Sequence, residues 1–249
     1  MANATTLELH GKPECKLSNA TRPAAVGKRV GPSRKRYSGN ENFERIGTAK
    51  RGFDLIVAVV GIVFIAPIFV CVALLMLLKE GRPIFYVSER MKTPETSFRF
   101  IKFRTMYVAL EGQNAGVTGG DKADRITPMG RILRRFRLDE IPQIVNILKG
   151  DMSFVGPRPP LRQYTDAFPE IYEAVLQSRP GVTGLATLHF HRHEERLIAH
   201  SKSSVETDTI YTTRCIPRKA ELDLIYQRHA SVWFDAVIMW QTIRCLMKR

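Results

Sequence analysis

The stretch FDLIVAVVGIVFIAPIFVCVALLMLL, residues 53–78, decides the fold, and Asp54 is its only charged side chain. As a helix rising 1.5 Å per residue it would be about 39 Å long, against a bilayer hydrocarbon core of about 30 Å. A helix in the core of a soluble protein is seldom apolar on every side. The stretch therefore predicts a helix embedded in a membrane.

Pro67 lies near the middle of this run and predicts a kink or break, because proline removes one helical hydrogen bond and clashes with the preceding turn. Basic residues flank both ends, and an excess of Lys and Arg marks the cytoplasmic ends of membrane segments. These residues are Lys50 and Arg51 before the run, and Lys79 and Arg82 after it. We therefore expect a re-entrant helix–break–helix over residues 49–82, with a kinked spanning helix as the alternative.

Upstream, residues 1–48 contain few large apolar side chains, which is typical of a disordered tail. The basic cluster at residues 28–36 could bind anionic headgroups or simply be solvated. The whole chain carries a formal charge of +14, which attracts nucleic acid, anionic lipid or phosphorylated small molecules without choosing among them. The four cysteines are widely spaced and suggest neither a zinc site nor a disulfide framework.

Downstream, residues 83–249 have the character of a soluble domain. Residues 83–87 and 98–106 predict two strands of a β-hairpin, with Lys102 and Arg104 on the same strand face. Residues 111–125 are Gly-rich and predict a loop, and several helices follow. The last helix, at 232–246, carries aromatic residues that suit either a membrane interface or an ordinary core. The expected fold is α+β and mostly helical: a re-entrant helix, a short hairpin and a compact catalytic domain at the membrane interface.

The densest group of reactive residues lies at 134–159. Apolar residues at 141, 144, 145 and 148 fall on one helix face, which places Asp139 and Glu140 at the N-terminus of that helix. A helix N-terminus stabilises an ionised carboxylate and also suits a phosphate. Acidic residues often occupy this position merely as helix caps, so the pair by itself has two interpretations.

Cations surround this pair in the sequence and favour a phosphate site. Arg158 lies between Pro157 and Pro159, whose fixed φ angles stiffen the backbone. Carboxylates that hold Mg²⁺ among cations that neutralise phosphate oxygens are typical of metal-assisted phosphoryl transfer. The alternative is a solvated basic face with incidental ion pairs. The candidate phosphate-binding residues are Lys102, Arg104, Arg134, Pro157, Arg158 and Arg179, and the candidate Mg²⁺ ligands are Asp139 and Glu140.

Two weaker features follow. Residues 179–184 form a rigid turn with Arg179 at its mouth, which could line a substrate pocket or only turn the chain. His189, His191 and His193 alternate, so we expect them on one face of a strand, as a metal site or, more simply, a polar surface strip.

The segments LDEIPQ, NILKGDMS and VGPRP within 134–159 closely resemble the bacterial sugar transferase family, the small monotopic polyprenyl-phosphate phosphoglycosyl transferases. The glucose- and galactose-phosphate transferases of exopolysaccharide synthesis, which act on undecaprenyl phosphate, belong to this family. Further similarities occur in the family's order over residues 49–249. They are Lys50-Arg51 with Asp54, Ala66-Pro67, the KFRTM segment at 102–106, the RPGVTG turn at 179–184, and Asp223-Leu224 with Tyr226.

The resemblance implies a reaction. Asp139 would attack the β-phosphorus of a UDP-sugar with Glu140 as its partner in a Mg²⁺-dependent pair, releasing UMP and forming a covalent phosphosugar–enzyme. Polyprenyl phosphate would then accept the sugar phosphate, while Arg134, Arg158 and Lys102 hold phosphates. A location in the bacterial inner (cytoplasmic) membrane follows, with the catalytic domain on the cytoplasmic face, membrane lipid around it and downstream glycosyltransferases as further partners.

Two other classes of protein are compatible with parts of the sequence. A membrane-tethered nucleic-acid-binding protein would explain the net charge, but the chain has no helix-turn-helix, RNA-binding or zinc-finger signature, so no nucleic acid is expected. A non-catalytic scaffold of a polysaccharide assembly complex would explain the membrane helix, although the intact Asp139–Glu140 pair argues against it. The sugar and the glycan pathway stay open.

Overall fold

The computed structural model describes residues 41–108 and 116–248, and the predicted basic tail lies mostly outside them. The described part is mostly helical, as predicted, and it contains two small two-stranded sheets, of which the sequence predicted only the hairpin. Its α-helices are α1 (Glu41–Glu80), α2 (Pro128–Arg135), α3 (Ile144–Lys149), α4 (Arg162–Ala167), α5 (Pro169–Val175), α6 (Leu185–Ile198), α7 (Ser204–Ile210), α8 (Ile216–His229) and α9 (Val232–Met247). Its strands are β1 (Phe85–Met91), β2 (Ser97–Phe103), β3 (Ser153–Val155) and β4 (Gly181–Thr183). Short helices of other types are η1 (Gly120–Arg125), η2 (Leu138–Gln143) and η3 (Tyr211–Cys215).

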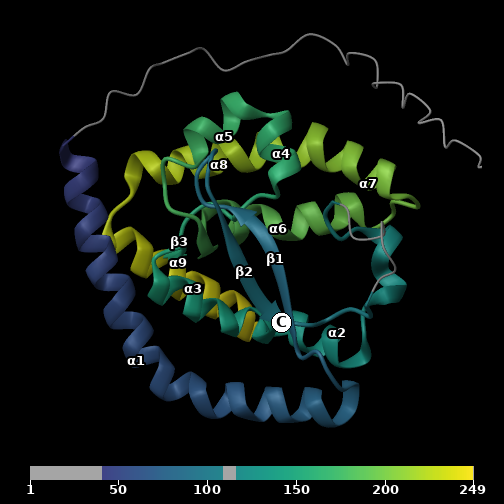
Figure 1. Ribbon diagram of the computed structural model, residues 1–249. Helices are drawn as coiled ribbons and strands as arrows, with labels where there is room; N and C mark the ends of the chain where they lie inside the picture. Colours follow the sequence, from purple (N-terminus) through teal and green to yellow (C-terminus); the bar gives the residue numbers. More distant parts are fainter. Residues whose placement is uncertain (1–40, 109–115, 249) are drawn as a thin grey trace, which may run out of the picture. The chain divides into compact units, whose positions relative to one another are not determined.

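Helix α1 contains the apolar run and changes direction partway along its length, as Figure 1 shows. It begins at Glu41, earlier than the predicted boundary after residue 48, and it stays helical through Pro67 where we expected a break. A bend without a break is a common result of proline inside a helix, because only one hydrogen bond is lost. Only 11% of its most apolar window is buried, so α1 is no core helix of a soluble protein, and it fits a membrane anchor.

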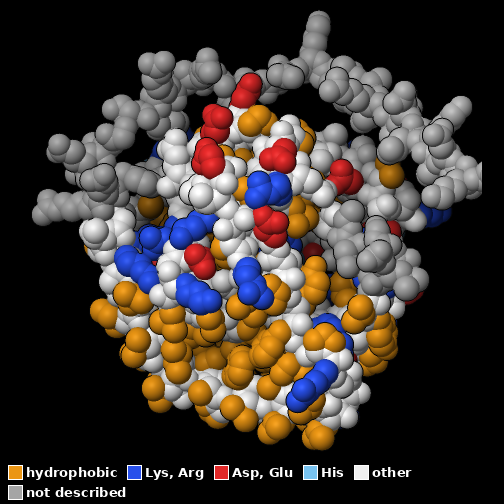
Figure 2. Space-filling model, viewed as in Figure 1, with side chains coloured by type: hydrophobic (Ala, Val, Ile, Leu, Met, Phe, Trp, Pro, Cys, Tyr) orange, Lys and Arg blue, Asp and Glu red, His pale blue; other side chains and the backbone are white. Residues whose placement is uncertain are grey.

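Both arms of α1 pack against the same folded body. In the first arm, Ala58 is fully buried in a cluster with Phe98, Phe100, Ile147 and Met152. In the second arm, beyond Pro67, Val72 and Met76 pack with Phe103 and Leu133. The outer faces of both arms stay exposed, and Figure 2 shows an apolar lower surface with a belt of basic side chains above it.

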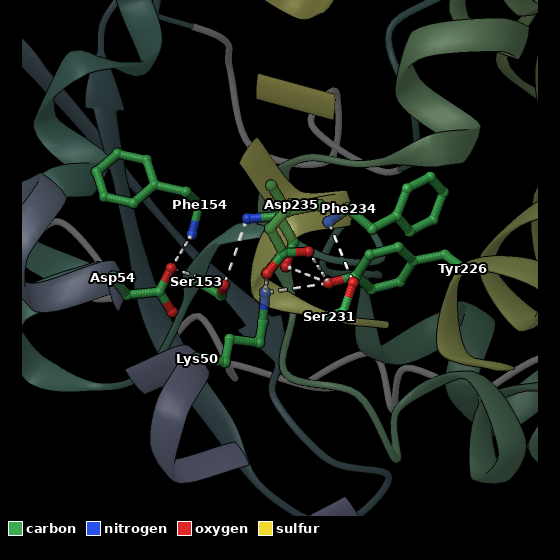
Figure 3. A network of polar contacts seen from close by, with 9 residues as sticks. Lys50, Asp54, Ser153, Phe154, Tyr226, Ser231, Phe234 and Asp235 are labelled. Atoms are coloured by element: carbon green, nitrogen blue, oxygen red, sulfur yellow. Dashed lines mark hydrogen bonds and ion pairs between the residues drawn. The ribbon is translucent and has the colours of Figure 1, made fainter. Parts of the chain in front are cut away.

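A polar network fastens the first arm to the body (Figure 3). Lys50 forms an ion pair with Asp235 of α9, and its ammonium also donates to the Tyr226 hydroxyl, 3.0 Å away. Tyr226 in turn donates to Asp235 over 2.6 Å. One oxygen of Asp54 accepts from the Ser153 hydroxyl and the Phe154 amide, at 3.1 and 3.2 Å. Lys50, just before the apolar run, and Asp54, near its start, therefore join α1 to α9 and β3.

The predicted hairpin is present, with β1 and β2 antiparallel and Phe85 opposite Phe103. These two rings stack at 5.4 Å, and Phe69 of α1 packs on both. The prediction that Arg104 shares a strand face with Lys102 is wrong, because β2 ends at Phe103. The Arg104 guanidinium instead donates to the backbone carbonyls of Glu80 and Gly81, at 2.8 and 3.3 Å, and so caps the end of α1.

The segment predicted as a simple turn at 179–184 contains β4, which pairs in parallel with β3. The two strands approach so closely that glycine is required. A Cβ on Gly156 would lie 2.2 Å from the Arg179 carbonyl oxygen, and one on Gly184 would lie 2.2 Å from the Gly156 carbonyl oxygen. These close backbone contacts at Gly156 fix the path of the chain that continues from β3 to Arg158.

The three alternating histidines lie on helix α6, so their placement on a strand is wrong. Ala186, Phe190 and Ile198 are buried on this helix, a spacing near the helical period that outweighs the short alternation. His189 and His193 are one turn apart, and the His193 ring packs against Phe190 at 5.3 Å.

The Gly-rich segment predicted as a loop at 111–125 is a 3-10 helix, η1, at its end. The last helix is present close to its predicted bounds, as α9.

Candidate active site

The Asp139–Glu140 pair lies in the first turn of η2, a 3-10 helix that leads into α3. The predicted helix therefore begins slightly earlier and in a tighter form, and Gly150 ends it at φ 82° as expected. Arg137 precedes η2 in the left-handed conformation, at φ 55°. That conformation costs about 1–2 kcal/mol for a residue with a Cβ, so the contacts of its side chain must offset the cost.

Glu140 is held by two arginines. Arg137 Nη2 donates to Oε2 and Arg158 Nη2 donates to Oε1, both over 2.7 Å. Burial alone would raise the pKa of Glu140, but the charges and hydrogen bonds of Arg158 and Arg137 outweigh it and lower the pKa to about 2. Glu140 is therefore ionised at any physiological pH, with both oxygens occupied.

Asp139 has a different environment although it is the adjacent residue. Its side chain is 7% exposed, and no hydrogen bond or ion pair from the described part of the chain occupies its carboxylate. Burial and the neighbouring Glu140 charge raise its pKa, while the positive charges of Lys102, Arg134 and Arg158 oppose that rise. Asp139 is thus a carboxylate within reach of three cations but committed to none of them.

Arg134 and Lys102, two of the cations that act on Asp139, are each held by a contact with the hairpin segment. Arg134 Nε donates to the Thr105 hydroxyl over 2.8 Å, just past the end of β2. The Lys102 ammonium lies 5.3 Å from the centre of the Tyr86 ring on the facing strand. Burial, together with the charge of Arg134, lowers the pKa of Lys102 to about 8. A cation with a lowered pKa is one that gains from an anionic ligand.

Four of the predicted residues therefore share one electrostatic environment with Asp139: Glu140, Lys102, Arg134 and Arg158. Pro157 lies in the backbone that carries Arg158, where its carbonyl accepts from the Gly181 amide over 2.8 Å. Arg104 and Arg179 are not brought to the pair. The charges that act on Arg179 are those of Arg51, Asp54 and Asp151, beside the first arm of α1.

Sequence reasoning missed several residues around the pair. Arg137 is not among the candidate residues from the sequence, although its spacing of three from Glu140 suggests an ion pair. Thr105 and Tyr86 come from the hairpin, and no pattern in the sequence links them to Arg134 or Lys102. Gln143 is fully buried with its side-chain amide unpartnered, three residues after Glu140.

Of the two carboxylates expected to bind Mg²⁺, only Asp139 has no partner in the described part of the chain. Among the residues that the structure describes, no group of three His, Cys, Asp or Glu could hold a metal ion. Glu140 has both oxygens on arginines, so Asp139 is the carboxylate with free oxygens. Mg²⁺ is commonly bound through one or two carboxylates together with substrate phosphates, and this donor set fits that mode.

Comparison with known proteins places the chain among sugar transferases. The bacterial sugar transferase family matches residues 45–249. The chain is 32% identical over 203 residues to a UDP-N-acetylgalactosamine-undecaprenyl-phosphate N-acetylgalactosaminephosphotransferase of Aeromonas hydrophila, covering 80% of this chain and 43% of the relative. It is 32% identical over 197 residues to the UDP-glucose:undecaprenyl-phosphate glucose-1-phosphate transferase of Escherichia coli (strain K12), covering 78% and 39%.

A shorter relative matches over most of its length. The chain is 31% identical over 212 residues to the exopolysaccharide production protein ExoY of Rhizobium meliloti (strain 1021), covering 79% of this chain and 84% of the relative. Against the two longer transferases the chain spans less than half of the relative. The family match includes most of α1, both sheets and the Asp139–Glu140 pair. This chain belongs to the bacterial sugar transferase family.

Proposed function

We propose that this protein transfers a sugar-1-phosphate from a UDP-sugar to undecaprenyl phosphate, at a membrane step of exopolysaccharide or related glycan synthesis. The observation that carries the proposal is the asymmetry of two adjacent buried carboxylates. Glu140 is saturated by arginines, whereas Asp139 is unoccupied and faces the charges of Lys102, Arg134 and Arg158. A nucleophile must have a free lone pair, and cations around it attract the phosphate it attacks.

The reaction runs in two steps on Asp139. Its carboxylate oxygen forms a bond to the β-phosphorus of the UDP-sugar, and the bond from that phosphorus to the oxygen bridging the α-phosphate breaks, so that UMP leaves. A phosphate oxygen of the lipid then bonds to the same phosphorus and releases the Asp139 carboxylate. Lys102, Arg134 and Arg158 stabilise the negative charge on the phosphate oxygens, and Glu140 holds Arg158 and Arg137 in position.

Mg²⁺ would be held by Asp139 together with the diphosphate of the donor, and when bound it supplies positive charge to that diphosphate. Glu140 would contribute less to holding the ion, because both of its oxygens already accept from arginines and only their remaining lone pairs are left for a metal. In this proposal the main role of Glu140 is to hold Arg137 and Arg158 in position.

The packing of α1 supports a re-entrant helix over a spanning one. Ala58 before Pro67 and Met76 after it are both buried against the same body. A straight helix carries these residues about 27 Å apart along its axis, and a spanning helix would leave one of them on the far side of the bilayer. A bent helix that enters and returns leaves both ends at one surface, where Lys50 and Arg51 contact the body. The basic ends support a cytoplasmic location for that surface.

The activity is tested with purified protein, undecaprenyl phosphate, Mg²⁺ and a panel of UDP-hexoses and UDP-N-acetylhexosamines, measuring UMP release. We expect turnover with at least one donor and none with Asp139→Asn. Exposed Asp166→Asn on α4 is the matched control and should keep full activity. Without the lipid acceptor, the mass of the intact protein should increase by one phosphosugar. UMP release by Asp139→Asn at the wild-type rate would refute the mechanism and leave a non-catalytic scaffold as the better account.

The membrane topology is tested by cysteine labelling. In a background whose four native cysteines are replaced by serine, single cysteines introduced at Thr48 and Arg82, on opposite sides of the apolar run, should react with a membrane-impermeant reagent from the same face of sealed vesicles. Reaction from opposite faces would establish a spanning helix instead.

A further inference from the structure

A groove of about 340 Å³ lies between α6 and α9, and neither Asp139 nor Glu140 lines it. Its lining comes from one turn of α6 and the last two turns of α9. The lining residues are Leu188, His189, Gln241, Arg244, Cys245 and Lys248. The proposed reaction uses none of them. One of them, His189, belongs to the three alternating histidines that the sequence analysis described.

The groove is positively charged. Arg244 and Lys248 are four residues apart, so they lie on the same side of α9, and both are exposed. No carboxylate lines the groove, and no ion pair from the described residues engages either cation. The Gln241 amide and the His189 ring add hydrogen-bonding groups at its edge. This set of donors suits a phosphate group.

An apolar stripe runs along α9 beside these cations. Trp233 is 79% exposed, Trp240 58% and Met247 72%, and their spacing of seven keeps them on one helix face. The opposite face, at Asp235 and Ile238, is buried. Exposed tryptophans beside Lys and Arg are typical of a helix lying in a membrane interface, where the apolar face enters the lipid and the cations meet the headgroups.

The first turn of α9 lies at the level where the chain enters the apolar run. Asp235 is paired with Lys50, which precedes the run that begins at residue 53. The helix that bears Trp233 and Trp240 is therefore fixed next to the point at which α1 enters the lipid.

We propose that the α6–α9 groove binds the phosphate headgroup of an anionic phospholipid of the surrounding bilayer, while the α9 stripe contacts its acyl chains. The charge of the groove attracts this lipid, and the adjoining stripe explains why the occupant is a lipid rather than a soluble phosphate. A second copy of the chain is disfavoured, because it would present the same positive charge.

The chain's two tryptophans, Trp233 and Trp240, both lie on α9, so the intrinsic tryptophan fluorescence reports on this helix alone. Full-length protein is reconstituted into phosphatidylcholine vesicles with a small, fixed fraction of brominated phosphatidylglycerol or brominated phosphatidylcholine. We expect stronger quenching by the anionic lipid at the same fraction, because the groove concentrates it. Equal quenching by the two lipids would overturn the proposal.

The variant Arg244→Gln/Lys248→Gln should reduce the preference for the anionic lipid at least about fivefold. The variant Lys202→Gln/Arg214→Gln removes the same charge from exposed positions outside the groove and should keep the preference. An unchanged preference in the groove variant would also refute the proposal. UMP release should be retained in both variants, so this test can fail while the proposed catalytic function stands.

Two additions distinguish the sources of phosphate. Inorganic phosphate should leave the quenching by brominated phosphatidylglycerol unchanged. If phosphate instead relieved the quenching, the groove would be a site for soluble anions and the proposal would be refuted. One equivalent of undecaprenyl phosphate should leave it unchanged too. Displacement by that lipid would instead assign the groove to the acceptor substrate.

Discussion

Asp235 in the network of Figure 3 and Asp139 in the candidate active site are both buried aspartates beside basic groups, but they differ in how their oxygens are used. One oxygen of Asp235 accepts from Tyr226 and the other pairs with Lys50. Asp139 has three cations in its field and no committed partner. Removing one partner of a fully paired buried charge destabilises a fold, whereas a buried charge that is left available can react. Burial alone therefore does not identify the catalytic residue.

The largest expected contrast separates Asp139 from its neighbour. Asp139→Asn should lower turnover at least about a thousandfold and leave the free energy of unfolding unchanged or slightly higher, since it removes a buried charge without breaking a contact. Glu140→Gln should lower the free energy of unfolding by about 2 kcal/mol, because Arg137 and Arg158 lose their carboxylate. Urea unfolding and UMP release on the same samples check both. Equal destabilisation by the two changes would contradict the comparison.

The network around Asp235 should respond in the opposite way. Asp235→Asn leaves the Lys50 ammonium buried without a charge partner and should lower the free energy of unfolding by about 3 kcal/mol. Turnover per folded molecule should stay within about twofold of wild type, since the change touches no substrate. Thermal unfolding in detergent provides the first quantity. A stable but inactive variant would mean that this network acts in catalysis.

The pH dependence tests Lys102. Because its pKa is lowered to about 8, it is charged below that pH and loses its proton as the pH rises through it. We expect kcat/KM for the UDP-sugar to fall on the alkaline side of about pH 8, because phosphate binding needs the charged form. Lys102→Arg should move this fall to higher pH, since a guanidinium stays protonated. An alkaline limb that stays in place in this variant would assign it to another group.

The smallest expected effect concerns Arg179. Its electrostatic neighbours are Arg51, Asp54 and Asp151, so Arg179→Gln should change KM for the UDP-sugar by less than about twofold. Arg134→Gln, the matched change beside Asp139, should raise KM about tenfold or more. Steady-state kinetics on both variants would show whether Arg179 belongs to the donor site, as its position in the RPGVTG segment suggested.

The sequence singled out Asp139 and Glu140 as candidates, but it did not show which side chains contact them. Asp139 and Glu140 are adjacent in the sequence, whereas the contact of Arg158 with Glu140 spans 18 residues and depends on the fold between them. Arg104 was misplaced, because the end of a strand depends on pairing that the sequence pattern does not specify. The histidines of α6 were misplaced because alternation over five residues is weaker evidence than the helical spacing of the buried Ala186, Phe190 and Ile198.

The sequence by itself determined that a long apolar helix with a central proline precedes a basic segment bearing two acidic residues. Those features depend only on residue type and spacing, because the transfer of apolar side chains out of water favours them whatever the rest of the chain does. Only the tertiary structure decided that both arms of α1 rest on one body, that Arg158 occupies Glu140, and that Asp139 stays free. Such differences arise from contacts between distant segments, because whether a charge is paired depends on what packs against it.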